Sequence, residues 1–325
     1  MKKRANRFLI GGAVAAAGAT LVAAYGVTSK YLMKLALDRE GPKNVSREKE
    51  KMMTSGDFSG VLEVLTKASQ SLENTDMEQV EITGHDGVTL AGHWYCPDNP
   101  KRVIVAMHGW RSTWSQDFGL IAPFWHENDC AVLYAEQRGQ GNSGGDYMGF
   151  GLLERHDCLD WINFVNERTF GSLPIFLGGI SMGATTVLMT GGFDLPDNVC
   201  GIVADCAFTS PHAIWKHVVE SNFHLPYGIY RAAADDLCKR KINVASDSYS
   251  TMEALEKCTV PVLFIHGTDD NFVPVEMTYE NYKACSAPKR LLVVPGAEHG
   301  MSYLIDKEAY ENAVTDFWNE CENKK

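Results

Sequence analysis

The feature of this chain that most constrains its fold is a glycine–serine pentapeptide, Gly179–Gly183, which reads GISMG. The apolar segment 173–178 precedes it and the small, apolar segment 184–189 follows it, so the pattern predicts a buried strand, a sharp turn and a helix. In such a turn a serine hydroxyl projects from strained backbone, and the glycines let the strand and the helix approach closely. The pattern therefore indicates that Ser181 is a nucleophile.

Two candidate partners of the serine follow it along the chain. The apolar strand predicted at 260–265 continues as HGTDDNFVP, and the apolar strand predicted at 291–294 continues as PGAEHG. An acid and a histidine thus each follow the C-terminal end of a strand, the edge where open α/β sheets bind ligands. Because a serine hydroxyl needs an adjacent base, we expect His299 to be that base, oriented by a carboxylate.

A serine nucleophile also requires hydrogen-bond donors for the oxyanion that forms on the attacked carbonyl. The backbone N–H of Met182 lies at the predicted helix N-terminus, where it can face this charge. A second donor is expected from the loop that follows the apolar strand predicted at 103–107 and reads HGWRS. We expect this donor to be the backbone N–H of Trp110, because Gly109 permits the turn. His108 is expected to brace the loop by hydrogen bonds.

A second glycine pattern, GQGNSG at Gly139–Gly144, matches the spacing of a dinucleotide-binding loop. In that kind of loop the last glycine opens a helix directly, whereas here the helical pattern resumes only near Leu152. We therefore expect a structural loop, together with Arg138, beside the active site. The sequence has no Walker lysine motif, no H-E-x-x-H and no C-x-x-C, so neither a cofactor nor a metal site is predicted.

The composition fits one large globular domain with appendages. The chain has 325 residues, of which 45% are hydrophobic, and its formal net charge of −11 argues against nucleic acid as a main partner. Nine cysteines are scattered along it without tight spacing. Several fall in predicted strands, where buried thiols behave as small apolar groups. None lies in the pentapeptide, so a cysteine nucleophile is not expected.

The N-terminus predicts membrane attachment. Residues 1–7 carry four cations, and residues 8–27 form an uncharged run of about the length that spans a bilayer core. The cations favour a cytoplasmic N-terminus, which would place the catalytic domain outside. A cleaved secretory signal, with small residues at 17–19, is the alternative. We expect an anchor or signal at 1–28 and a mostly helical connector at 29–77.

The rest of the chain, 78–325, is expected to form an α/β domain with a mostly parallel, doubly wound sheet. An antiparallel hairpin is predicted at 80–95, and strands and helices then alternate. The segment 211–257 interrupts this alternation with helical, aromatic-rich sequence, which predicts an inserted lid. We expect most aromatic residues of the lid to pack within it, although they could line a substrate pocket. The same two roles are open for Trp110 and Trp114.

Together these motifs resemble the α/β-hydrolase superfamily, close to bacterial membrane-anchored serine hydrolases that are labelled lysophospholipase-like or serine-aminopeptidase-like. The resemblance covers about residues 78–325 and is carried by seven segments: 108–110, 137–143, 147–161, 179–183, 205–210, 266–274 and 296–300. It implies the α/β-hydrolase fold. Many relatives have Asp where this chain has Glu136 or Gln137, and this departure leaves the contacts of that loop open.

The residue pattern alone does not decide which carboxylate orients His299. Asp269 and Asp270 are adjacent, and Asp205 ends another predicted strand from which some hydrolases of this fold take their acid. The resemblance favours Asp270, the fifth residue of the family's H-G-x-x-D-x-x-V-P pattern. It thus implies a triad of Ser181, His299 and Asp270, with Asp269 as a solvated turn residue.

The resemblance implies hydrolysis of an ester, a thioester or an amide. Carboxylic esters are expected first, including lipid or lysophospholipid esters, because an anchor would hold the site near lipid. A peptidase or amidase and an acyltransferase could use the same triad. A binding or scaffold protein without catalysis is the alternative from a different class.

Overall fold

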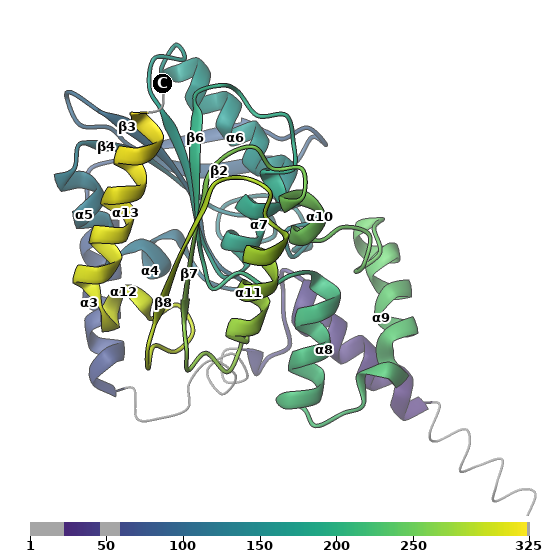
Figure 1. Cartoon of the computed structure of the whole chain (residues 1–325). Coiled ribbons are helices and arrows are strands. Elements are labelled where there is room, and N and C mark those ends of the chain that lie inside the picture. The colour runs from purple at the N-terminus through teal and green to yellow at the C-terminus, as the bar shows by residue number, and fades with distance from the viewer. Residues whose placement is uncertain (1–22, 46–58, 324–325) are drawn as a thin grey trace, which may run out of the picture.

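The computed structural model describes residues 23–45 and 59–323, and within them an α/β fold is built on one eight-stranded sheet (Figure 1). The strand order is β1-β2-β4-β3-β5-β6-β7-β8. The strands are β1 (Glu78–Thr83), β2 (Thr89–Tyr95), β3 (Arg102–Met107), β4 (Cys130–Ala135), β5 (Ile175–Ile180), β6 (Val199–Asp205), β7 (Val262–Gly267) and β8 (Lys289–Val294). Strands β3 to β8 are parallel to one another, and β1 and β2 form the expected antiparallel hairpin.

The central strands are apolar along their whole length because helices cover both faces of the sheet. Every residue of β3 and of β4 is buried. One face packs against α6 (Glu154–Arg168), α7 (Met182–Thr190), α10 (Thr251–Leu255) and α11 (Val275–Ala284). The other packs against α3 (Ser59–Glu73), α4 (Trp114–Phe118), α5 (Ala122–Glu127), α12 (Ser302–Ile305) and α13 (Lys307–Glu322). This three-layer arrangement confirms the predicted α/β class with a mostly parallel, doubly wound sheet.

A third apolar cluster lies outside these layers and joins three helices that are far apart in the sequence. The helix at 23–37 packs with α8 (Pro211–Ser221) and α9 (Tyr227–Ile242), and Figure 1 shows these three helices side by side at one end of the molecule. Two of them, α8 and α9, come from the segment expected to form a lid. The last helix of that segment, α10, instead packs on α7 through Leu255.

The predicted anchor or signal at 1–28 falls mainly on residues 1–22, which lie outside the described residues, as does part of the predicted connector, 46–58. The described helix at 23–37 crosses the predicted boundary at residue 28 without a break. Within the described ranges, no helix combines the length and the hydropathy that a bilayer span requires.

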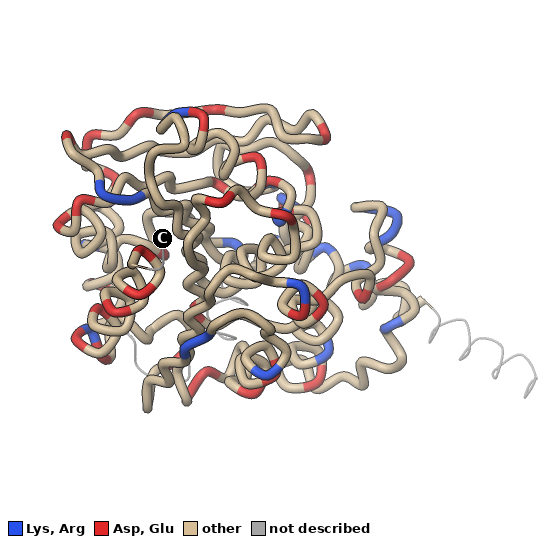
Figure 2. The backbone as a smooth tube through the Cα atoms, turned by 45° about the horizontal axis from the view of Figure 1, so that its top comes forward, with Lys and Arg blue, Asp and Glu red and all other residues tan. Residues whose placement is uncertain are grey.

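Charged residues of both signs occur throughout the described chain. Figure 2 shows acidic and basic positions interspersed along the loops and the outer faces of the helices. Acidic positions are therefore distributed along the described chain and are not gathered in one segment.

Candidate active site

Ser181 occupies a strained turn between β5 and α7. Its φ of 57° and ψ of −117° lie in a region that residues with a side chain rarely adopt. The flanking glycines make this turn possible. A Cβ atom on Gly179 would lie 2.4 Å from the carbonyl carbon of Gly183, and a Cβ atom on Gly183 would lie 1.7 Å from the carbonyl oxygen of Met107. The pentapeptide thus needs small residues at both glycine positions, as its pattern predicts.

The structure brings Ser181, His299 and Asp270 together in one chain of hydrogen bonds. The Nε2 atom of His299 lies 2.9 Å from the Ser181 Oγ atom, and its Nδ1 atom lies 2.7 Å from Oδ2 of Asp270. All three side chains are buried. They come from the ends of three parallel strands, β5, β7 and β8, which meet at the carboxyl edge of the sheet. In this geometry the imidazole can accept the serine proton while the carboxylate holds its other nitrogen.

Asp270 is held as an anion. Burial raises the pKa of its carboxyl group, but the charge of His299 and hydrogen bonds from His266 and His299 outweigh burial and bring the pKa well below its usual range. The second carboxylate oxygen, Oδ1, accepts the backbone N–H groups of Phe272 and Val273 at 2.9 and 2.8 Å. Both oxygens are therefore satisfied, and the carboxylate stays ionised at neutral pH.

The two rival acids have other surroundings. Asp269 is exposed and its carboxylate accepts the hydroxyl of the neighbouring Thr268 at 2.7 Å. Asp205 is buried, and its carboxylate accepts the Ser302 hydroxyl at 3.3 Å. Burial raises the pKa of Asp205 to about 6. Its backbone carbonyl accepts the N–H of Ser181 at 2.9 Å, so Asp205 supports the turn through its main chain.

His266 is a site residue that the sequence analysis did not single out. It is fully buried, and its Nε2 atom lies 3.1 Å from Oδ2 of Asp270 and 2.9 Å from the carbonyl oxygen of Val273. Because both neighbours are acceptors, Nε2 must carry a proton, and Nδ1 can accept the Thr278 hydroxyl at 2.7 Å. The available signal was the first residue of HGTDDNFVP, a histidine at the end of a buried strand.

The loop after β3 passes directly beside the serine. A Cβ atom on Gly109 would lie 3.4 Å from the Cβ atom of Ser181, so the next residue, Trp110, lies close to the nucleophile. His108 braces this loop, because its Nε2 atom accepts the N–H of Gln137 at 3.1 Å. Met182 is the first residue of α7, where a backbone N–H has no acceptor within the helix. Both predicted oxyanion donors thus belong to segments that adjoin Ser181.

The glycine-rich segment Gly139–Gly144 forms a loop that protein groups already fill. Gly139 and Gly141 have positive φ angles, and a Cβ atom on Gly141 would lie 1.9 Å from a carboxylate oxygen of Glu136. The guanidinium of Arg39 donates to the carbonyl oxygens of Gly141 and Ser143. This packing fits the expected structural loop.

Glu136 and Arg138 hold that loop in place. Although burial opposes ionisation of Glu136, hydrogen bonds from His93 and Asn142 lower its pKa to about 2. Arg138 is buried and pairs with Asp157 and Asp86. Many relatives have Asp where this chain has Glu136 or Gln137, and these contacts show how the loop is held with Glu136 in this chain.

Two groups of side chains among the described residues have the spacing of metal ligands. One consists of Cys206, Asp270 and His299, whose ligand atoms lie within 4.8 Å of one another, and the other of His85, Asp157 and Asp160. In the first group Asp270 and His299 already bind each other, and in the second Asp157 binds a guanidinium. In both groups, therefore, some of the atoms that could bind a metal ion already bind other protein groups.

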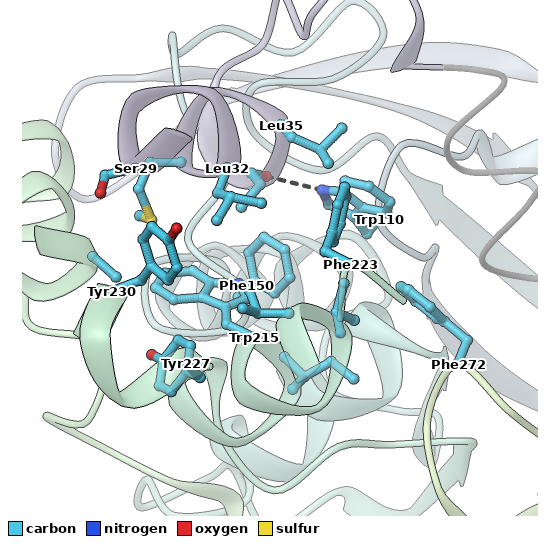
Figure 3. Close-up of a pocket in the computed structure, with 16 residues that line it drawn as sticks. Ser29, Leu32, Leu35, Trp110, Phe150, Trp215, Phe223, Tyr227, Tyr230 and Phe272 are labelled. Carbon is cyan, nitrogen blue, oxygen red and sulfur yellow. Dashed lines mark hydrogen bonds between the residues drawn. The ribbon is translucent and has the colours of Figure 1, made fainter. Parts of the chain in front are cut away.

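A chamber lined by apolar side chains, shown in Figure 3, lies near the triad. It lies between the helix at 23–37, α8 and α9, with Trp110, Phe150 and Phe272 completing its wall. Phe272 links it to the triad, because its ring meets the His299 ring edge-on with centroids 5.0 Å apart. Trp110 therefore has a pocket role, whereas Trp114 stacks on His93 elsewhere, with ring centroids 4.1 Å apart.

A family model described as serine aminopeptidase, S33, matches residues 98–225. An uncharacterized protein of Mycobacterium tuberculosis is 34% identical over 245 residues, which cover 74% of this chain and 79% of that protein. The uncharacterized protein YqkD of Bacillus subtilis is 26% identical over 252 residues, which cover 76% and 81%.

Among solved structures, an esterase of Pyrococcus furiosus, Pf2001, has a similar fold. Its TM-score is 0.63 at 20% sequence identity, and the match covers 83% of this chain and 96% of that one. At this identity the likeness concerns the fold alone.

Proposed function

This chain belongs to the α/β-hydrolase superfamily, and from this premise we propose that it is a serine esterase that cleaves carboxylic esters through an acyl-enzyme. The observation that carries the proposal is the hydrogen-bonded chain from Asp270 through His299 to Ser181, placed beside an apolar chamber. A buried serine bonded to an imidazole, itself bonded to an ionised carboxylate, is an activated nucleophile.

In the first half of the reaction, the Ser181 Oγ atom attacks the ester carbonyl while His299 Nε2, 2.9 Å away, takes the hydroxyl proton. The imidazolium that forms is stabilised by Asp270. The backbone N–H groups of Met182 and Trp110 stabilise the oxyanion. His299 then gives its proton to the leaving alcohol, and the acyl group stays on the serine.

In the second half, His299 takes a proton from water, and the hydroxide attacks the acyl-enzyme carbonyl. Collapse of this second tetrahedral intermediate breaks the bond to Ser181 and releases a carboxylic acid. The serine recovers its proton from His299. No cofactor takes part in these steps.

The chamber favours apolar esters over peptides with a free N-terminus. An aminopeptidase has to bind the ammonium group of its substrate, which a carboxylate does best. Among the residues that line this chamber, none is Asp or Glu, and most are aliphatic or aromatic. A lipid ester matches this apolar lining. The predicted N-terminal anchor would hold the site near such substrates. The family model's description keeps an aminopeptidase as the second candidate.

The test is fluorophosphonate labelling of the full chain in detergent, read by intact mass. We expect stoichiometric labelling of the wild type and none of Ser181→Ala. Labelling of His299→Ala and Asp270→Asn should be slower by roughly 10³-fold or more. Asp205→Asn is the matched control and should react at close to the wild-type rate, because its carboxylate does not bind the imidazole.

Matched ester and amide substrates then separate the candidate activities. Faster cleavage of the esters supports the esterase, whereas faster cleavage of aminoacyl amides would replace it by a peptidase. If folded wild-type protein is not labelled, or if Ser181→Ala is labelled as well, the proposed mechanism is wrong.

A further inference from the structure

One wall of the apolar chamber comes from a segment that precedes the whole sheet. The helix at 23–37 contributes Ser29, Leu32, Met33, Leu35 and Ala36 to the lining. These positions lie ahead of residue 78, where the hydrolase domain was expected to begin. They also lie ahead of residues 98–225, which match the family model. The chamber is therefore completed by an N-terminal element added to the fold.

This helix is fastened to the loop that carries the proposed oxyanion donor. The indole N–H of Trp110 donates to the carbonyl oxygen of Ala36 at 2.9 Å. The guanidinium of Arg111 donates to the carbonyl oxygens of Leu35, at 2.9 and 3.0 Å, and of Asp38, at 2.6 Å. The last carbonyl groups of a helix have no N–H donor within the helix. The guanidinium of Arg111 donates to such carbonyl groups here.

The residues after the helix are also tied to the body of the protein. The N–H of Met148 donates to the carbonyl of Leu37 at 2.8 Å, and the N–H of Arg39 donates to Asp146 at 2.8 Å. The ammonium group of Lys241, on α9, lies 2.6 Å from the carboxylate of Asp38. Contacts on several sides thus fix the position of the helix at 23–37.

One side of the chamber adjoins the triad, and the opposite side lies away from it. At one end Phe272 contacts His299, and its ring centroid lies 6.2 Å from that of Trp110. In Figure 3 Ser29 and Tyr230 lie at the opposite side of the chamber from Phe272. A hydrocarbon chain that starts at the triad would therefore run past Trp110 and end at Ser29, a small residue at the far end.

We propose that the helix at 23–37 is the specificity-determining wall of the substrate site, and that Ser29 sets the length of the hydrocarbon chain that the site accepts. The substrates are then esters with a long, unbranched apolar chain. This inference rests on the proposed function. Apolar burial supplies the selectivity, since each buried methylene increases the rate constant kcat/KM by about fourfold.

The experiment measures kcat/KM of the full chain in detergent with p-nitrophenyl esters of increasing acyl length. A second series, acetate esters of alcohols of increasing length, shows whether the chamber takes the acyl or the alkyl chain. For the wild type we expect kcat/KM to rise with chain length in one series and then to fall at a cutoff.

Ser29→Phe fills the far end and should lower kcat/KM at least tenfold for chains near the cutoff while leaving the shortest esters unchanged. Lys30→Phe is the matched control, because it adds the same ring on the exposed side of the same helix. Leu32→Ala enlarges the chamber and should move the cutoff to longer chains, which provides a test if Ser29→Phe does not fold.

An unchanged length profile in Ser29→Phe and in Leu32→Ala would overturn this inference, as would an equal change in Lys30→Phe. Failure of the proposed function looks different. In that case the wild type cleaves no ester of any length and is not labelled by fluorophosphonate.

Discussion

Asp205 shows how burial alone can change the protonation of a side chain next to the proposed triad. Its carboxyl group has a pKa of about 6, against 3.8 for the ordinary group, because it is removed from water. Between these values the unfolded chain loses a proton that the folded protein keeps. Stability therefore falls as the pH rises from about 4 to about 6, and above pH 6 the full loss caused by Asp205 remains.

We predict that Asp205→Asn removes this pH dependence, since an amide cannot ionise and can still accept the Ser302 hydroxyl. The two proteins should differ little near pH 4. The variant should gain stability relative to the wild type between pH 4 and 6, by up to about 3 kcal/mol. Urea unfolding at pH 4, 5, 6 and 7 measures the difference. A difference that stays constant over this range would contradict the assignment, and fluorophosphonate labelling shows that the variant is folded.

Among the contacts between elements, those of Arg111 hold the end of the helix at 23–37. Arg111 has a φ of 50°, which is strained for an arginine, and its guanidinium donates to carbonyl groups at the end of this helix. Removal from water lowers the pKa of Arg111 to about 10, so it is still charged at neutral pH. A charged donor that binds the part-buried carbonyl groups of two residues is costly to remove.

We predict that Arg111→Ala loosens this helix before the rest of the protein. Hydrogen exchange of backbone amides in 23–37 should become faster by at least tenfold, while amides of β3 to β6 stay protected. The loss of charged hydrogen bonds should lower the free energy of unfolding by about 1.5–3 kcal/mol. Arg290→Ala is the control, because Arg290 pairs with Glu320 at the exposed surface. Equal exchange in both variants would show that Arg111 does not hold the helix.

At the scale of the whole molecule, the packing of the three layers decides which thiols can react. All nine cysteines are free, and Cys96 is exposed whereas the other eight are buried. Burial raises the pKa of several of these thiols, among them Cys130, to about 11, and Cys158, to about 12. Thiolates react and neutral thiols do not, so burial and a raised pKa both protect these positions.

We predict that a thiol-specific disulfide reagent modifies one cysteine of the native protein rapidly and all nine after denaturation. The Cys96→Ser variant should lack the rapid reaction, and its eight remaining cysteines should react only after denaturation. The amount of chromophore released over time gives the number of thiols that react in the native protein and the number that react after denaturation. Rapid modification of several thiols in the native Cys96→Ser protein would mean that the core opens far more readily than its packing implies.

Features that depend on neighbours in the chain could be predicted from the sequence alone. The glycines around Ser181, the buried strands and the order of serine, acid and histidine all predicted a doubly wound α/β fold. The first two of these signals are local. A strained turn needs small residues beside it, and strands covered on both faces need continuous apolar runs.

Which distant groups meet depends on how the whole chain packs. It placed Asp270, rather than Asp269 or Asp205, against His299, and it brought His266 to the same carboxylate. It also placed the carbonyl of Ala36 on the indole of Trp110, 74 positions along the chain. No sequence period encodes such a contact, because it depends on how whole helices and loops pack. For that reason the segment expected to be a connector became a wall of the chamber.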